Sequence, residues 1–262
     1  MNRFDCKTLA DSILDQVAAI PHKDKSLLIL YAGDDPASAS YMKGKIKDCE
    51  RCGIPYHHVK CHAEKAMEAL IADCNEAEDI GGIIVQLPLP DGWDAEKLTQ
   101  MVAPEKDVDG FRPDSRFSPC TPEGIIRIMK ESYGEDLSGS EVLLIGKGRL
   151  VGKPLIDMLL DEGCTLTVAH SKTKNLDMLL DEYHDFTICG AGVENLVDLM
   201  NIGHGLVIDA SIMRGSDRKL CGDCFNFTED CGDSIFVTPV PGGVGLMTRA
   251  ILMEHMGMVQ YD

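Results

Sequence analysis

The sequence predicts a two-lobed α/β protein with a parallel sheet in each lobe. Residues 27–30 and 82–85 form short runs that are apolar on both faces, which is typical of strands covered on both sides. Segments of helical character lie between such runs, as expected for βαβ units. The chain has 262 residues, enough for two modest domains that each have a core.

The first lobe is expected to start from strand 27–30. A helix should follow it, capped by Ser38 or Ser40 and ended by Gly53, because hydroxyl side chains favour helix starts and glycine favours helix ends. Strand 82–85 comes next, and the double-proline turn after it interrupts the strand.

The second lobe is expected to open with a linking helix, with Thr121 as its cap and Pro122 in its first turn. Further strands and one early helix follow: strands 141–145, 164–169, 186–189 and 206–209, and helix 154–160. This series is of the dinucleotide-binding, Rossmann type.

Three parts of the chain are therefore expected. The first domain covers residues 1–120, and the Rossmann-type, NAD(P)-binding domain covers residues 121–245. Residues 246–262 contain a helix, expected at 247–256, that returns to pack on the first lobe.

Composition excludes several classes of protein. A formal net charge of −18 argues against non-specific binding of nucleic acid or of anionic membrane. No run approaches the roughly 20 apolar residues that a membrane span needs. Eleven cysteines without an N-terminal apolar leader indicate a reducing, cytoplasmic setting. The pairs Cys49–Cys52 and Cys221–Cys224 lie too far apart for a zinc ribbon, so no metal is expected.

The turn after strand 141–145 is a candidate phosphate site. Gly146, Gly148 and Gly152 approximate the GxGxxG fingerprint, with the third glycine one residue late. A plain strand-to-helix turn explains such a pattern equally well. The helix that Pro154 starts favours the nucleotide interpretation, because a helix N-terminus presents N–H groups to a phosphate.

The end of strand 164–169 indicates which nucleotide is bound. NAD-binding proteins usually carry Asp or Glu there to bind the ribose hydroxyls. This chain has His170, Ser171 and Lys172 instead, and a hydroxyl with a cation suits a 2′-phosphate better. NADP is therefore expected over NAD, which remains possible.

Polar residues of three other segments form a candidate acid–base set. Tyr41 and Lys45 are four residues apart, so a helix places them on one face. Gln86 ends a strand at the double-proline turn, and Asp107 and Asp109 follow in a third segment. Considered singly, each of these residues also has a purely structural explanation: a half-buried tyrosine, a solvated lysine or a turn.

Taken together, these segments resemble the bifunctional methylenetetrahydrofolate dehydrogenase/methenyltetrahydrofolate cyclohydrolase family. The matching segments begin at Ser38, Gln86, Lys106 and Pro239, and the resemblance extends over nearly the whole chain. It implies that the first domain binds tetrahydrofolate derivatives and carries the acid–base chemistry.

The resemblance also implies residue roles. Lys45 corresponds to the general acid/base and Tyr41 to the ring that stacks on the folate. Gln86 corresponds to the glutamine that hydrogen-bonds the lysine, and Asp107 to the aspartate that joins this pair. Asp109 corresponds to the residue that binds the pterin ring.

Two loops complete the implied sites. Pro241, Gly242 and Gly243 border the folate, and Leu246 stands where the family has proline. The residues implied to hold the cofactor are Gly146, Lys147, Gly148, Val151, Gly152, Ser171 and Ile212. Lys147 and Gly148 depart from the arginine and serine of the family's turn.

The implied activity is NADP-dependent oxidation of 5,10-methylenetetrahydrofolate, then hydrolysis of the methenyl product to 10-formyltetrahydrofolate. A homodimer that pairs through the nucleotide lobes is also implied. Three alternatives stay open: an enzyme with weakened dehydrogenase activity, a paralogue that binds ligands without turnover, and another two-lobed dehydrogenase such as one acting on shikimate.

Overall fold

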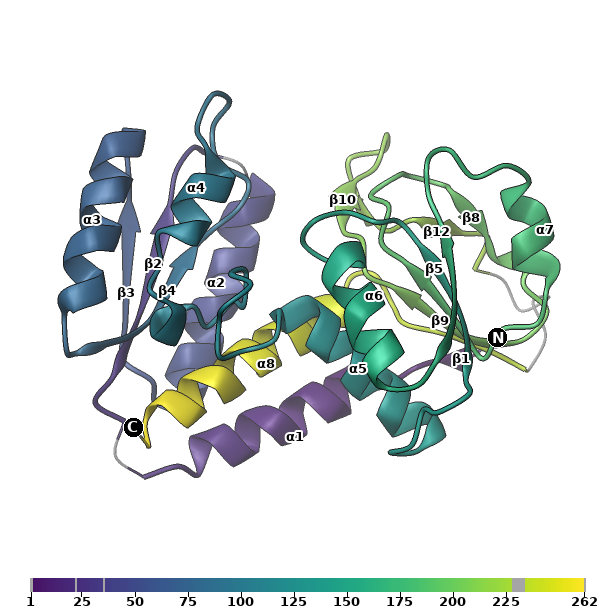
Figure 1. Ribbon diagram of the computed structural model, residues 1–262, viewed down its shortest axis with the longest axis horizontal. Coiled ribbons are helices and arrows are strands. Elements are labelled where there is room, and N and C mark those ends of the chain that lie inside the picture. Colours follow the sequence, from purple (N-terminus) through teal and green to yellow (C-terminus); the bar gives the residue numbers. More distant parts are fainter. Residues whose placement is uncertain (1, 22, 35, 228–233, 262) are drawn as a thin grey trace. The chain divides into compact units, whose positions relative to one another are not determined.

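The structure is a computed structural model that describes residues 2–21, 23–34, 36–227 and 234–261 (Figure 1). The chain divides into two compact units. Unit 1 comprises Met1–Ala10 and Thr121–Thr248, and unit 2 comprises Asp11–Cys120 and Arg249–Asp262. The prediction of an α/β protein with a parallel sheet in each part is confirmed.

Unit 2 is built on a three-stranded parallel sheet in the order β3-β2-β4. Its elements are β2 (Ser26–Tyr31), α2 (Pro36–Cys52), β3 (Tyr56–Lys60), α3 (Glu64–Glu76), β4 (Ile80–Val85), α4 (Ala95–Gln100) and the 3-10 turn η1 (Pro104–Lys106). Three helices contain a boundary between the units: α1 (Cys6–Ala18), α5 (Cys120–Tyr133) and α8 (Val244–Val259).

The sheet of unit 2 is covered on both faces, as its apolar strands predict. Met67 and Ile71 of α3 and Leu98 of α4 pack with Leu28 and Leu30 of β2 in one buried cluster. On β4, Gly82 faces the α8 side chain of Met256 instead, because alternate strand residues point to opposite faces.

Unit 1 holds a six-stranded parallel sheet in the order β1-β13-β9-β7-β5-β6. Its main elements are β1 (Asn2–Arg3), β5 (Glu141–Ile145), α6 (Gly152–Asp161), β6 (Thr165–Ala169), α7 (Leu176–Asp181), β7 (Phe186–Cys189), β9 (Gly205–Asp209) and β13 (Ile235–Val237). Short pairs and one turn complete it: β8 (Val197–Asp198) with β12 (Cys224–Phe225), β10 (Met213–Arg214) with β11 (Leu220–Cys221), and the 3-10 turn η2 (Leu199–Asn201).

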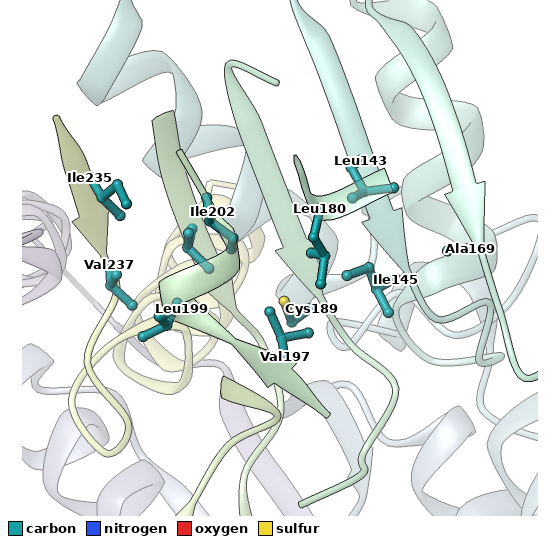
Figure 2. Packing of buried hydrophobic residues seen from close by; sticks show 11 residues of the cluster. Leu143, Ile145, Ala169, Leu180, Cys189, Val197, Leu199, Ile202, Ile235 and Val237 are labelled. Carbon is teal, nitrogen blue, oxygen red and sulfur yellow. The ribbon is translucent and has the colours of Figure 1, made fainter. Parts of the chain in front are cut away.

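One hydrophobic core cluster of unit 1 lies against a face of this sheet, and Figure 2 shows its side chains. Leu143 and Ile145 of β5 and Cys189 of β7 pack there against Leu180 of α7. The neighbouring residue Leu144 is also fully buried, on the other face of the sheet. Because both faces are apolar, these strands could be recognised from the sequence alone.

The strand order of unit 1 reverses direction beside β5. The next strand in the chain, β6, pairs on one side of β5, and β7 pairs on the other. Parallel sheets bind ligands outside the carboxyl ends of the strands at such a reversal. The loops after β5 and β7 therefore mark the ligand-binding edge of unit 1.

Several local expectations differ from the structure. The first ten residues were expected in the first domain, but β1 pairs with β13 and belongs to unit 1. Helix α2 begins at Pro36 rather than at a serine cap, since proline suits the first helical position. Thr121 lies inside α5 and not at its cap, and its hydroxyl is 3.0 Å from that of Thr248. Helix α8 is longer than the expected 247–256.

In the part of the chain that the structure describes, no helix has the length and apolarity to cross a membrane.

Replacing Gly82 with alanine should destabilise the protein by about 1–3 kcal/mol, the usual cost of overpacking. A β-carbon at this position would lie 2.5 Å from Met256 Sδ and 2.8 Å from Val108 Cγ2. Urea unfolding measures the change. Gly203→Ala is the matched control, because nothing lies within 4 Å of its β-carbon position. Equal stability of the two variants would contradict the packing of α8 on β4.

Candidate active site

Lys45 is a buried cation of unit 2. Its side chain is only 4% exposed, and Nζ lies 3.9 Å from Oδ2 of Asp109. The same Nζ lies 5.3 Å from the centre of the Tyr41 ring, as the four-residue spacing on α2 predicts. A buried ammonium is costly unless it is paired, so the carboxylate and the ring both stabilise it.

The other lysines of α2 lie away from this site. Lys43 and Lys47 are exposed, whereas Lys45 is buried. At 100° per residue, a helix turns positions 43 and 47 to the side opposite Tyr41 and Lys45. The crowding of lysines in the sequence therefore does not mean crowding of charge in the site.

Gln86 lies at the carboxyl end of β4, and its side chain is buried. Its Nε2 donates a hydrogen bond of 2.9 Å to the carbonyl of Leu87, while its Oε1 is buried and has no hydrogen-bond partner among the described residues. The expected hydrogen bond to Lys45 is not formed. An unpaired buried acceptor of this kind is costly.

Asp107 and Asp109 lie on a tight loop after η1. The backbone N–H of Arg112 donates to Oδ2 of Asp107 at 2.8 Å, and Ser115 Oγ donates to the carbonyl of Asp107 at 3.0 Å. Burial raises the pKa of Asp107, and the backbone N–H groups only partly oppose this effect. Gly110 permits the turn, since it has φ +71° and a β-carbon there would overlap the backbone of Ser118.

The arrangement also differs from the expected lysine–glutamine–aspartate set in its aspartate. The carboxylate within ion-pair distance of Lys45 belongs to Asp109. The carboxylate of Asp107 instead accepts a hydrogen bond from the backbone N–H of Arg112 in its own loop. The two acids are close enough for the charge of Asp109 to raise the pKa of Asp107 further.

A second buried ion pair lies beside the first, and sequence reasoning missed it. Arg249 of α8 places Nε 3.1 Å from Oδ2 of Asp48, and burial raises the pKa of Asp48. The guanidinium occupies the space over Gly44, where a β-carbon would overlap it. No local sequence signal predicts this pair, because its members are about 200 residues apart in the chain.

In unit 1, the turn after β5 is sterically tight. Gly146 has φ +111°, and a β-carbon there would overlap the backbone of Gly190, which follows β7. A β-carbon on Gly152 would overlap the carbonyl of Gly146, so both glycines are required for packing. Nothing lies within 4 Å of a β-carbon at Gly148, which leaves open space over the turn.

The start of α6 offers fewer N–H groups than the sequence suggested. The N–H of Lys153 donates to the carbonyl of Gly148, and Pro154 has no N–H. Lys147, Arg149 and Lys153 are all exposed around the turn. Attraction of a phosphate here therefore rests on these side chains as well as on the helix dipole.

The turn after β6 lies beside the turn after β5. Residues Ile145 and Ala169 are paired in the two strands, and the N–H of Gly146 donates to the carbonyl of Ala169. Ser171 and Lys172 are exposed on this second turn, which is closed by hydrogen bonds between His170 and Thr173. A hydroxyl and cations from neighbouring strand ends thus share one edge of the sheet.

Buried carboxylates support the loops after β7 and β9. Asp223 accepts hydrogen bonds from the N–H groups of Ala191 and Val193 at 2.7 and 2.8 Å. Asp209 accepts from the N–H of Ser211 at 3.1 Å, and burial raises its pKa. Ile212, the expected cofactor contact, follows this anchored residue and is 53% exposed.

The loop before α8 also belongs to unit 1. The peptide bond between Val240 and Pro241 is cis, and Gly242 has φ +104°. A β-carbon on Gly243 would overlap the carbonyl of Pro239, so the loop needs glycine there. Of the predicted residues, Tyr41, Lys45, Gln86, Asp107 and Asp109 lie in unit 2, and all the others lie in unit 1.

The first CxxC pair is part of the core. Cys49 and Cys52 are both buried on α2, and Cys49 Sγ lies 3.8 Å from Met253 Sδ. Burial raises the pKa of Cys49 to about 12 and that of Cys52 to about 11. Thiols of this kind stay protonated and pack as small apolar groups.

The sequence matches two protein-family domains. Residues 4–109 match the tetrahydrofolate dehydrogenase/cyclohydrolase catalytic domain, and residues 119–260 match the NAD(P)-binding domain of the same enzymes. The chain belongs to the tetrahydrofolate dehydrogenase/cyclohydrolase family. The resemblance inferred from the motifs is thereby confirmed.

Curated relatives agree over most of their length. The bifunctional protein FolD of Campylobacter jejuni strain RM1221 is 40% identical over 245 residues, covering 88% of this chain and 86% of that protein. FolD of Lachnoclostridium phytofermentans is 36% identical over 271 residues, covering 96% of this chain and 95% of that protein.

Solved structures share the fold. Bifunctional FolD from Campylobacter jejuni has a TM-score of 0.88 at 33% identity, over 98% of this chain and 97% of that one. The Trypanosoma brucei enzyme complexed with NADP and an inhibitor has a TM-score of 0.88 at 25% identity, over 99% of this chain and 96% of that one. A shikimate dehydrogenase from Peptoclostridium difficile reaches a TM-score of 0.50 at 14% identity, over 89% of this chain and 91% of that one, and shares the fold alone.

The raised pKa of Asp107 gives a test of its burial. The unfolded chain ionises this carboxyl near its ordinary pKa of 3.8, whereas the folded protein ionises it only at higher pH. Stability is therefore lost as pH rises through the folded pKa, and Asp107→Asn removes that loss.

We expect the variant to gain urea resistance over the natural protein as pH rises above the ordinary pKa of 3.8. The amide oxygen of asparagine can still accept from the N–H of Arg112. A difference in unfolding free energy that does not change with pH would show that burial does not raise the pKa of Asp107.

Proposed function

We propose that this protein oxidises 5,10-methylenetetrahydrofolate to the methenyl form with NADP and then hydrolyses it to 10-formyltetrahydrofolate. The observation that carries the proposal is the buried Lys45 beside the carboxylate of Asp109 and the ring of Tyr41. Family membership over both domains supports it, as does the bound NADP of the Trypanosoma brucei relative.

In this proposal, unit 2 binds the folate. The Tyr41 ring stacks on the flat heterocycle, and the carboxylate of Asp109 accepts hydrogen bonds from the pterin amino group and ring N–H. The unpaired Oε1 of Gln86 receives a hydrogen bond when Lys45 or the substrate approaches, which removes the cost of leaving it buried and unsatisfied.

The oxidation step depends more on the alignment of the folate with the nicotinamide than on acid–base catalysis. NADP held in unit 1 would supply a nicotinamide ring that can accept a hydride from the methylene carbon. The residues proposed to hold it are the two tight glycines Gly146 and Gly152, with Val151 and Ile212 beside them. The open space over Gly148 and the exposed cation of Lys147 fit a phosphate group.

Hydrolysis is assigned to Lys45. Water adds to the positively charged methenyl carbon, and its proton passes to the lysine amine. The bond from that carbon to N5 then breaks as the carbonyl forms: the lysine returns its proton to N5, and the remaining hydroxyl proton is released to water. The carboxylate of Asp109 holds the lysine side chain in place for this step.

Pro241, Gly242 and Gly243 are proposed to border the bound folate, on the family resemblance. Pairing into a homodimer and a cytoplasmic location are proposed on the same basis. The charge of −18 is the reason to expect neither nucleic acid nor anionic membrane as a partner.

The direct test supplies the pure, reduced protein with 5,10-methylenetetrahydrofolate and either NADP or NAD, and separately with the methenyl substrate. We expect NADP reduction without lasting methenyl product, together with hydrolysis of the added methenyl compound. Hydrolysis without reduction would identify an enzyme whose dehydrogenase activity has been lost. Inactivity in every assay would leave a binding protein.

Lys45→Met should lower hydrolysis by about 10²–10⁴-fold, the usual contribution of a general acid/base. Oxidation should suffer less, because hydride transfer passes no proton to the protein. Lys43→Met is the matched control, since Lys43 is exposed on the same helix. Undiminished hydrolysis in Lys45→Met would exclude this lysine as the base.

Ser171→Asp should raise the KM for NADP about tenfold or more, equivalent to about 1.4 kcal/mol, by repelling the 2′-phosphate. The KM for NAD should stay level or fall, since a carboxylate there can bind the ribose hydroxyls. Lys147→Ala should raise the KM for NADP as well. Lys219→Ala, whose side chain is 84% exposed beside Asp217, is the control. Equal effects on both nucleotides would contradict 2′-phosphate recognition at this edge.

A further inference from the structure

His255 is a buried titratable group that the proposed chemistry does not use. It lies on α8, is only 2% exposed, and its Nδ1 is 2.9 Å from the carbonyl oxygen of Val108. Because a carbonyl oxygen can only accept, Nδ1 carries the hydrogen in this contact. The ring is also stacked on Phe117, with centres 4.4 Å apart and planes inclined by 21°.

Val108 lies between the two acids of the candidate site, and it is fully buried. Its carbonyl receives a second donor, the thiol of Cys120, whose Sγ is 3.3 Å away. The thiol and the imidazole are also neighbours, with Cys120 Sγ 3.6 Å from Nδ1 of His255. Two side chains from different helices therefore converge on this one backbone atom.

The carbonyls on either side are bound differently. The carbonyl of Asp107 accepts from the N–H of Gly110 at 3.2 Å and from Ser115 Oγ at 3.0 Å, and that of Asp109 accepts from the N–H of Cys120 at 3.2 Å. The backbone donors form with almost any sequence, and Ser115 belongs to the same loop as Asp107. The carbonyl of Val108 instead takes its donors from side chains of two helices outside the loop.

We propose that His255 is a positioning residue for the acid–base site, acting through the carbonyl of Val108 on the carboxylate of Asp109. Fixing this carbonyl fixes the peptide plane between Val108 and Asp109, because that peptide is planar. The direction in which the Asp109 side chain leaves the backbone is then set. The 3.9 Å spacing between Asp109 and Lys45 follows from that direction.

The loop needs a fixed backbone because the electrostatic interactions of its two acids would otherwise change its conformation. Asp107 and Asp109 repel each other, and burial makes both charges costly. A carboxylate that also attracts Lys45 and a bound pterin would be drawn from its position without a rigid backbone. The side chain of Val108 packs against Gly82 of β4, and the imidazole of His255 donates a hydrogen bond to its carbonyl. These two contacts fix the position of Val108.

This inference rests on the proposed function, and two variants of His255 test it. His255→Leu removes the donor but keeps an apolar side chain against Phe117, whereas His255→Gln keeps an N–H donor. We expect His255→Leu to lower kcat for hydrolysis by up to about 100-fold, as small misplacements in active sites do. His255→Gln should recover most of that activity. Met258→Leu, at an exposed position of the same helix, is the control and should behave as the natural protein does.

Hydrogen exchange separates failure of the inference from failure of the proposed function. The N–H groups of Gly110, Arg112 and Cys120 are all bonded to residues of the loop. We expect them to exchange faster in His255→Leu than in His255→Gln, whether or not the protein turns over folate. Cys120→Ala removes only the second donor to the carbonyl of Val108, so it should increase the exchange rates by a smaller factor. This variant replaces His255→Leu in the comparison if His255→Leu does not fold.

Unchanged exchange and unchanged kcat in His255→Leu would overturn the proposal. So would equal losses in His255→Leu and His255→Gln with equal drops in melting temperature, because that result would mean that the imidazole only fills space. A natural protein without folate activity would instead refute the proposed function, while the exchange comparison would still decide the role of His255.

Discussion

The acid–base site depends on the packing of the second half of α8 within unit 2. This helix is apolar on nearly every side and is therefore a core helix. Met256 packs against Gly82 of β4, Met253 lies against Cys49 of α2, and a β-carbon on Gly257 would contact Ile20 beyond α1. Burying each side chain of this size contributes about 1.5–3 kcal/mol to the free energy of unfolding. The helix thus holds α2 and β4 at the spacing that the buried charges require.

Burying those charges lowers the stability of the folded protein. Lys45, Asp107 and Asp109 are buried together, and Asp48 with Arg249 forms a second buried pair nearby. Buried ion pairs rarely stabilise a protein relative to apolar packing. They are consistent with a site where function limits stability, since a catalytic lysine must be desolvated and still correctly oriented. The apolar core around α8 offsets this cost.

Unit 1 meets a different constraint, the close approach of backbones at the edge of a parallel sheet. Gly146 lies against Gly190, and Gly152 against Gly146, with no room for a β-carbon. These contacts bring the loops after β5 and β7 together where the strand order reverses. Gly148 has open space instead. One of the two departures from the family's turn, Gly148, therefore falls at a position free of packing constraints, which is where cofactor contacts can vary.

The sequence by itself determined the strands β2, β4, β5 and β7 and the shared face of Tyr41 and Lys45, because both depend on residues that are near one another in the chain. It also located the acids and the glycine turns through their motifs. Only the tertiary structure decided that β1 pairs with β13, that Asp109 and not Asp107 lies beside Lys45, and that Arg249 and His255 reach α2 and the acidic loop. Periodicity and turn chemistry act over a few residues, whereas these contacts join segments more than 60 residues apart and follow from how the helices pack.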